Sequence, residues 1–215
     1  MNIIYILICM VLIYVIWHNY IFTHSTNAII PLSKYPKLEI LQENYNVILE
    51  ELKYILQNKL WSNYDDLHKK DIFRKNDINY VLTEMTKSQS KVEEKTENPK
   101  WKIYGLIYNK KSINETFCPQ TTKLLQSIPY IVNAGFSCLE PNKTTDEHTD
   151  NNDKYYRYQL PLIVPKKNTG FKVDNTSIKY EINKPFIFDD CYKHKAWNNS
   201  NEIRVVLICD IDRKN

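Results

Sequence analysis

YYRYQLPLIVP (155–165) and IRVVLICDI (203–211) are two of several short runs in the C-terminal half that are rich in β-branched and aromatic residues. The others are WKIYGLIY (101–108), YIVNAGFSCLE (130–140), SIKYEI (177–182) and PFIFDD (185–190). Runs of this kind, separated by turn residues and spaced by roughly 10–20 positions, are typical of an antiparallel sandwich or barrel. One helix is expected to interrupt them near 121–127. Residues 101–215 are therefore predicted to form a mainly β core.

The part of the chain before this core is predicted to be helical and then polar. Between Lys34 and Leu60, apolar residues recur at steps of three and four, which predicts an amphipathic helix that begins near Pro36. The stretch 62–100 is polar and charged, and we expect a long connection with one short helix there. Residues 25–100 should thus form a helical N-terminal section and a connection, packed on the β core.

The chain begins with an uncharged apolar run, IIYILICMVLIYVIW (3–17), which continues to Phe22. About 20 such residues can cross a hydrocarbon layer of ~30 Å as a helix. Trp17 and Tyr20 stand where an interfacial aromatic belt would lie. We therefore predict a single-pass membrane protein with an uncleaved anchor at 1–24, whose sparse flanking charges leave its orientation open. A cleaved signal peptide, which would need a basic start and a better cleavage site, and a buried helix are the alternatives.

The composition excludes several classes of protein. Of the 215 residues, 43% are hydrophobic and 25% are charged, which argues against a disordered or collagen-like chain. Only three glycines are present, too few for a glycine-rich phosphate loop or a dinucleotide-binding fingerprint. The net charge is +4 and basic residues alternate with acidic ones, so no nucleic-acid partner is predicted. Only four of the 29 basic residues are arginines, which makes each arginine a candidate for a specific role.

Two of the five histidines lie beside predicted strands and could bind a metal. His148 is followed by Asp150 two positions later, and His194 comes soon after the run that ends at Phe188. Two imidazoles and one carboxylate are the ligand set of non-haem Fe(II) oxygenases. The spacing of two positions places both side chains on the same side of a strand. The motif alone is weak, because ordinary surface histidines would produce it by chance.

Two of the arginines follow these histidines at similar distances. Arg157 lies nine residues after His148, and Arg204 lies ten residues after His194. An arginine that faces into an oxygenase barrel can bind a dicarboxylate through its planar fork, which lysine cannot reproduce.

The order of several motifs makes the chain resemble the aspartyl/asparaginyl β-hydroxylase family, a branch of the Fe(II)- and 2-oxoglutarate-dependent dioxygenases. The resemblance covers residues 101–213, with an earlier match at the start of the predicted helix. The matching motifs are YPKL (35–38), CPxT (118–121), FSxLxP (136–141), HT (148–149), Arg157 with LIVP (162–165), and IFDDxxxHxxWN (187–198) with Arg204 after it.

The resemblance implies a fold and a set of site residues. The fold is a double-stranded β-helix, which is the jelly-roll or cupin-like architecture, for residues 101–215. His148 and His194 would be the iron ligands, and Arg204 would bind the distal carboxylate of 2-oxoglutarate. Ser137 and Arg157 would make further contacts to 2-oxoglutarate.

The chain departs from the family pattern at two positions. The family typically has glycine where this chain has Asp150, so Asp150 either completes a facial triad or points away from the metal. A histidine that often stands two residues after the arginine is Gln159 here. Gln159 can still donate a hydrogen bond to 2-oxoglutarate but carries no charge.

The function implied by the resemblance is hydroxylation of the β-carbon of Asp or Asn in a protein substrate. The cofactor would be Fe(II), with 2-oxoglutarate and O2 as cosubstrates, and the resemblance favours a lumenal catalytic domain behind the membrane anchor. Three alternatives remain. The same chemistry could act on a lipid acyl chain or on a free amino acid, or the β-barrel could be catalytically silent and serve as a binding module.

Overall fold

The computed structural model describes residues 28–58, 61–64, 67, 79–81, 83–84, 100–150 and 153–214. The predicted membrane anchor at 1–24 lies outside these residues, as does most of the predicted connection at 62–100. Within the described part of the chain, no helix combines the length and the apolar character needed to cross a membrane.

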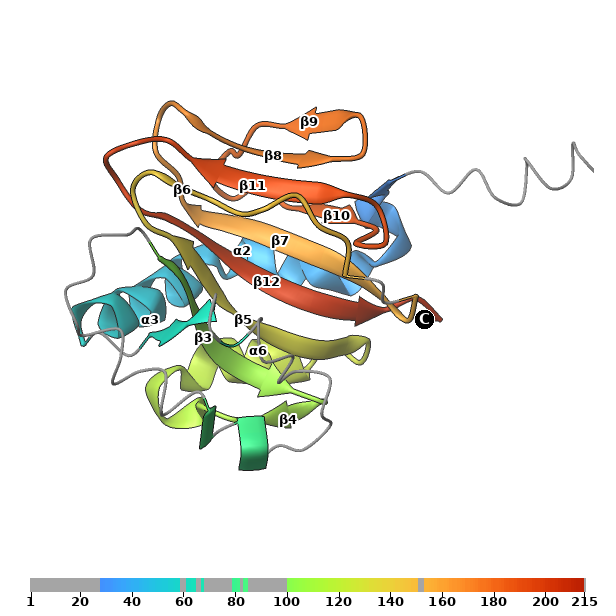
Figure 1. Cartoon of the computed structure of the whole chain (residues 1–215). Coiled ribbons are helices and arrows are strands. Elements are labelled where there is room, and N and C mark those ends of the chain that lie inside the picture. Colours follow the sequence, from blue (N-terminus) through green and yellow to red (C-terminus); the bar gives the residue numbers. More distant parts are fainter. Residues whose placement is uncertain are drawn as a thin grey trace, which may run out of the picture.

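Two antiparallel sheets form the core of the protein (Figure 1). The strands of the larger sheet are β1 (Ile29–Ile30), β2 (Ser62–Asn63), β3 (Trp101–Tyr108), β4 (Lys111–Ser112), β5 (Ile131–Leu139), β7 (Tyr155–Ile163), β10 (Phe186–Phe188) and β12 (Arg204–Asp212). The strands of the smaller sheet are β6 (Lys143–Thr144), β8 (Thr169–Val173), β9 (Thr176–Ile178) and β11 (His194–Asn198). The orders are β1-β10-β7-β12-β5-β3-β2, with β4 beside β3, and β6-β11-β8-β9.

The prediction of a mainly β, antiparallel core is confirmed, since all the strand pairs between described residues are antiparallel. From β5 to β12 the chain passes repeatedly from one sheet to the other, which is how a jelly roll is built. The N-terminal section also contributes to this core, because β1 and β2 form the two ends of the larger sheet. These two short edge strands were not predicted from the sequence.

Successive side chains along a strand point to opposite sides, so the larger sheet has two different faces. On β5 and β12, Phe136 and Leu207 belong to the cluster that the helices cover. Their neighbour Val206 belongs to the cluster between the two sheets, together with Phe171 of β8. A shift of one residue in the strand pairing would exchange these faces, so the apolar pattern fixes which side chains can line a site inside the barrel.

Helices cover the face of the larger sheet that points away from the smaller one. They are α2 (Glu39–Glu43), α3 (Tyr45–Gln57) and α6 (Pro119–Gln126), with short 3-10 turns η1 (Leu32–Lys34), η2 (Pro36–Leu38) and η4 (Glu115–Phe117). Figure 1 shows α2 and α3 behind the strands. The helix predicted near 121–127 is therefore present as α6. Glu51 of α3 fixes its start, because the Glu51 carboxylate accepts hydrogen bonds from the amides of Gln120 and Thr121 at 2.9 and 2.8 Å.

The single helix predicted before residue 60 is instead two helices, separated at Asn44. The backbone of Asn44 leaves the helical region, with φ −99° and ψ 21°. Its side-chain amide donates a hydrogen bond of 2.8 Å to the carbonyl of Ile40. Asparagine competes in this way with the helical hydrogen bonds of the backbone, which explains the break.

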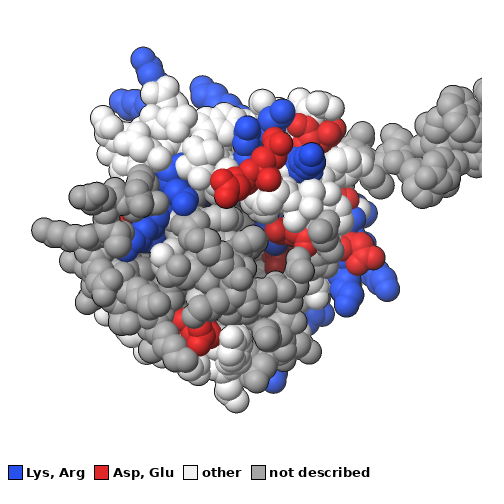
Figure 2. Space-filling view, viewed as in Figure 1, with Lys and Arg blue, Asp and Glu red and all other residues white. Residues whose placement is uncertain are grey.

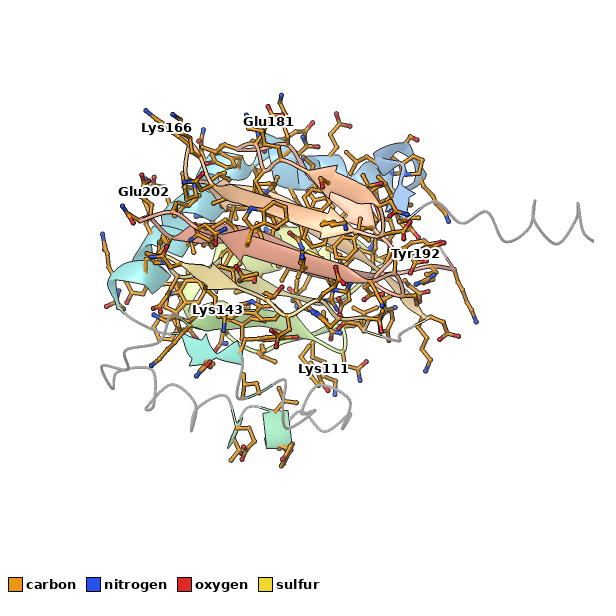
Figure 3. All side chains as sticks on the ribbon, turned by 45° about the horizontal axis from the view of Figure 1, so that its top comes forward. Lys111, Lys143, Lys166, Glu181, Tyr192 and Glu202 are labelled. Atoms are coloured by element: carbon orange, nitrogen blue, oxygen red, sulfur yellow. The ribbon has the colours of Figure 1, made fainter. Side chains whose placement is uncertain are left out.

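Charged side chains on the outside of the molecule are of both signs. Figure 2 shows Lys and Arg interspersed with Asp and Glu on the face in view. Lys166, Glu181 and Glu202 point away from the ribbon in Figure 3, and all three are exposed. His194 and Arg204, by contrast, are buried.

The position of the core can be tested at Phe136, which is 0% exposed between β5 and the helices. Replacing Phe136 with alanine is expected to lower the free energy of unfolding by about 3–5 kcal/mol, because it leaves a cavity. Denaturant titration measures this loss. The same replacement at Phe117, which is 40% exposed and stacks on Tyr54, should cost less than about 1.5 kcal/mol. Equal losses at the two positions would contradict this assignment of the core.

Candidate active site

The two predicted metal-binding histidines lie side by side at the edge of the smaller sheet. His194 begins β11, and His148 lies in the segment between β6 and β7. An isolated antiparallel bridge joins them. The amide of His148 donates to the carbonyl of His194 at 3.1 Å, and the amide of His194 donates to the carbonyl of His148 at 2.9 Å. The centroids of the two imidazole rings are 4.4 Å apart.

Hydrogen bonds to the backbone orient both imidazole rings. The Nδ1 atom of His148 is 2.6 Å from the carbonyl oxygen of Asp146, and that of His194 is 2.9 Å from the carbonyl oxygen of Tyr192. A carbonyl oxygen only accepts, so each Nδ1 carries a proton. Burial lowers the pKa of His194 to about 4, so this side chain is neutral at pH 7. Neutral imidazole with a free Nε2 lone pair is the form that binds a metal.

Asp150 completes a group of three possible ligands. Its Oδ1 atom lies 3.7 Å from Nε2 of His148. One donor atom from each of His148, Asp150 and His194 lies within 4.8 Å of the other two. Two donors that are each about 2.1 Å from one ion can be at most about 4.2 Å apart, so the 3.7 Å separation allows a shared metal. Two imidazoles and a carboxylate suit Fe(II).

Arg157 of β7 lies among three carboxylates. Its Nη1 is 2.9 Å from Asp150 Oδ2, and its Nε is 2.9 Å from Asp210 Oδ1. Its Nη2 is 3.4 Å from Asp190 Oδ2. Burial raises the pKa of Asp190 to about 7, although Arg157 acts in the opposite direction. All three guanidinium nitrogens of Arg157 thus face aspartates, whereas the sequence led us to expect a contact between Arg157 and 2-oxoglutarate.

Arg213 fixes the turn that leads into β11. Its guanidinium binds both carboxylate oxygens of Asp189, with Nη1 at 2.7 Å from Oδ2. Its Nε donates to the carbonyl of Tyr155 at 2.9 Å. These bonds join the C-terminal end of the chain to the turn between Phe188 and His194. No motif in the sequence points to Arg213, and the scarcity of arginine is the one signal that could have done so.

Arg204 is a buried cation without a counter-charge among the described residues. It starts β12, it is 2% exposed, and its Nε has no hydrogen-bond partner. The guanidinium carbon lies 5.0 Å from the centroid of the Tyr180 ring. Burying an unpaired guanidinium is costly, so this arrangement suits the binding of an anion.

Two further predicted residues, Ser137 and Gln159, are also buried. Ser137 accepts a hydrogen bond of 3.0 Å from the indole nitrogen of Trp101. Gln159 accepts one of 3.0 Å from the hydroxyl of Tyr180, whose ring also contacts Arg204. Tyr180 therefore links two of the predicted 2-oxoglutarate contacts. It lies in a short irregular segment after β9, and nothing in the sequence pattern distinguishes it.

A pocket opens next to this cluster on the inner side of β3 and β5. Most of its lining is apolar or aromatic, with polar groups at a few positions. The lining residues are Tyr64, Trp101, Ile103, Gly105, Ile107, Tyr108, Ile113, Asn133, Ala134, Gly135, Ser137, Arg157, Ile208 and Asp210. Trp101 connects the pocket to the histidines, since its ring centroid is 6.3 Å from that of His148.

Comparisons with known proteins agree with this arrangement. The sequence model of the family described as Aspartyl/Asparaginyl beta-hydroxylase matches residues 42–214. Among curated proteins, the ornithine lipid ester-linked acyl 2-hydroxylase of Rhizobium tropici is 38% identical over 115 residues, which are 52% of this chain and 41% of that protein. The human aspartyl/asparaginyl beta-hydroxylase is 27% identical over 106 residues, 46% of this chain and 14% of that protein.

The chain thus spans less than half the length of either curated relative. A solved oxidoreductase of the 2OG-Fe(II) oxygenase family from Burkholderia pseudomallei has 11% identity and a TM-score of 0.45, over 56% of this chain and 71% of that one. Because the family match extends over most of the chain, and because it includes each predicted site residue, the protein belongs to the aspartyl/asparaginyl β-hydroxylase family.

Proposed function

We propose that the protein is an Fe(II)- and 2-oxoglutarate-dependent dioxygenase that hydroxylates a carbon atom of its substrate. The observation that carries this proposal is the pair of imidazoles, both oriented by the backbone, beside the Asp150 carboxylate. His148 and His194 would hold the metal. When bound, Fe(II) supplies the oxidation chemistry, in which 2-oxoglutarate and O2 are consumed, succinate and CO2 are released, and one oxygen atom enters a C–H bond.

The residues of the barrel interior would bind and orient 2-oxoglutarate. Arg204 offers a buried guanidinium for the distal carboxylate, and the bond would supply the counter-charge that Arg204 lacks among the described residues. Ser137 and Gln159 have polar atoms in the same interior and would add hydrogen bonds. The Tyr180 ring, packed on Arg204, would hold that side chain in place and exclude water from the ion pair.

Two substrate classes remain candidates. Hydroxylation of Asp or Asn in a protein is supported by the family and by the name of the human relative. Hydroxylation of an acyl chain is supported by the name of the bacterial relative and by the pocket, whose wall includes Ile103, Ile107 and Ile113. The pocket wall also carries Asp210 next to Arg157, which disfavours a substrate carboxylate there. The lining therefore favours the acyl chain, and the predicted anchor at 1–24 agrees with a substrate in a membrane but stays a prediction.

The reaction is tested by incubating the protein with Fe(II), 2-oxoglutarate and O2, in the presence of either Asp- and Asn-containing peptides or ornithine lipid in detergent micelles. Succinate release should require Fe(II) and should stop when a chelator removes the metal. Mass spectrometry should then find one added oxygen atom in one of the two substrates. Succinate release that continues at the same rate in chelator would contradict the proposal, and an oxygen atom in the peptide would reject the acyl chain.

A further inference from the structure

We propose that Gly105 and Gly135 leave a gap without side chains in the wall of the pocket, that an acyl chain of the substrate runs through this gap, and that Gly105 thereby determines how long a chain fits. The inference rests on the proposed function, because it concerns the acyl-chain substrate of the same site. It assigns a role in specificity to two of the three glycines in the sequence.

Glycine is scarce in this chain and is not used where the backbone conformation would favour it. None of the three glycines has a positive φ, whereas six described residues of other types do, for example Asn142 with φ 61° and Asn168 with φ 65°. A positive φ is a common reason for glycine, because other residues meet a steric penalty there. Backbone conformation therefore does not explain Gly105 or Gly135, and the absence of a side chain is the property that remains.

The two glycines are direct cross-strand neighbours, Gly105 on β3 and Gly135 on β5. A Cβ atom on Gly135 would lie 2.6 Å from the carbonyl oxygen of Tyr104, so this glycine lets β3 approach β5 closely. Both glycines line the pocket, and on β3 the lining also includes Ile103 and Ile107. Residues two apart on a strand point to the same side. Between these two isoleucines, the pocket wall is therefore bare backbone.

The pocket extends across the strands, and the polarity of its lining changes from one end to the other. Its lining is polar at Arg157 of β7 and Asp210 of β12, which are cross-strand partners. At the β3 edge it is aromatic or apolar, with Tyr108 and Ile113. The strands follow one another in the order β7, β12, β5 and β3 (Figure 1). Three spacings of about 4.8 Å separate the first from the last, which gives roughly 14 Å.

A ligand that fits this pocket has a polar reacting end and a long, slim apolar tail. The candidate metal ligands lie at the polar end, where Arg157 forms an ion pair with Asp150. A tail that leaves this end for the β3 edge passes the glycine pair, where an acyl chain can lie directly on the backbone. Removing such a chain from water into the apolar end is favourable. The side chain of an Asp or Asn residue is too short to reach from the polar end to β3.

The competing interpretation is that the glycine pair serves only the close packing of β3 on β5. Under that interpretation, a side chain at Gly105 disturbs the sheet and lowers the turnover of every substrate to the same extent. Under the proposal, it excludes those acyl chains that extend past β3 and spares shorter ones. The two interpretations therefore differ in chain-length selectivity, which can be measured independently of the overall rate.

The test is a competition between ornithine lipids with an octanoyl and with a palmitoyl chain, present in equal amounts in the same detergent micelles. Fe(II), 2-oxoglutarate and O2 are supplied, and mass spectrometry gives the ratio of the two oxygenated products. Gly105→Leu is expected to lower the ratio of long to short product by roughly 10- to 200-fold, the usual effect of a small misfit in an apolar pocket. Gly105→Ala should give a ratio between those of the wild type and Gly105→Leu.

The matched control is Lys111→Leu, which introduces the same side chain at an exposed position of β4, the strand beside β3. Its product ratio should equal that of the wild type. An unchanged ratio in a folded Gly105→Leu protein, which includes an equal loss of both products, would overturn the inference. If Gly105→Leu does not fold, Gly105→Ala decides: a lowered ratio supports the inference, and an unchanged ratio overturns it.

A binding measurement without turnover separates failure of this inference from failure of the proposed function. Fluorescence anisotropy follows the binding of a palmitoyl ester with a fluorescent alcohol part to the metal-free protein. The wild type should bind this ester, and Gly105→Leu should bind it at least about ten-fold more weakly. If the wild type releases succinate in the presence of Fe(II) but does not bind the ester, the inference is refuted and the dioxygenase activity stands. If binding depends on Gly105 but no succinate is released, the inference stands and the dioxygenase activity is refuted.

Discussion

Replacing His194 with alanine is expected to abolish the turnover of 2-oxoglutarate. His194 is 5% exposed, and its ring orientation is set by the bond from Nδ1 to the carbonyl of Tyr192. Loss of a residue that merely orients a metal ligand costs roughly 10- to 100-fold in affinity or activity, so loss of the ligand itself should exceed about 100-fold. Succinate release at saturating 2-oxoglutarate and Fe(II) measures the effect.

The matched control for His194→Ala is Lys193→Ala, one position earlier in the chain. Lys193 is exposed, and the hydrogen bond that involves it uses only its backbone carbonyl, which accepts from the amide of Asp174. Its variant should release succinate at the wild-type rate. Thermal unfolding of both variants shows that they fold. A folded His194→Ala protein with more than a tenth of the wild-type rate would refute the assignment of His194 as a metal ligand.

Replacing Arg204 with methionine is expected to raise the Michaelis constant for 2-oxoglutarate strongly while the protein becomes no less stable. Truncating one partner of a buried charge pair costs about 2–5 kcal/mol, which corresponds to a loss of affinity of roughly 30-fold to several thousand-fold. In the absence of 2-oxoglutarate, by contrast, the side chain is a buried cation without an acidic partner among the described residues. An apolar residue of similar length removes that cost, so the unfolding temperature should stay the same or rise.

Kinetics and ligand-induced stabilisation measure the two parts of this result. Wild-type protein should melt at a higher temperature when 2-oxoglutarate is added without O2, and Arg204→Met should lose this shift. Arg204→Lys keeps the charge but not the planar fork, so its Michaelis constant should lie between the two. Lys172 of β8 is a cation that is only partly buried. Lys172→Met should therefore keep the Michaelis constant and the ligand-induced shift of the wild type. An unchanged Michaelis constant in Arg204→Met would contradict the assignment.

Much of the fold could be predicted from the sequence, because β strands and amphipathic helices leave local patterns. The runs at 101–108, 130–140, 155–165 and 203–211 match the long strands of the larger sheet, except that β12 extends one residue further, to Asp212. The apolar pattern does not encode helix breaks or very short strands, and these features were not predicted. Asn44 breaks the predicted helix through one side-chain bond, and β1 and β2 are too short to give a periodic signal.

The sequence indicates candidate residues for the site, but it does not indicate which of their side chains contact one another. Spacing and motif order indicate His148, His194 and Arg204 as candidates, and the structure places the two histidines side by side. The neighbours of Arg157 depend on the register of β7 against β12, which pairs it with Asp210. No local pattern specifies that register. The contact with 2-oxoglutarate that the resemblance implies for Arg157 stays a prediction, and the three guanidinium nitrogens of this residue face aspartates.

The backbone bridge between His148 and His194 has a mechanical consequence. Among the described strands, the segment with β6 and His148 pairs with β11 alone, so it forms the margin of the smaller sheet. A metal bound by both histidines would act as a cross-link between that margin and β11. It would close a long loop of chain in the way a disulfide does, and such closures remove conformational entropy from the unfolded chain. The iron would then stabilise the fold as well as take part in catalysis.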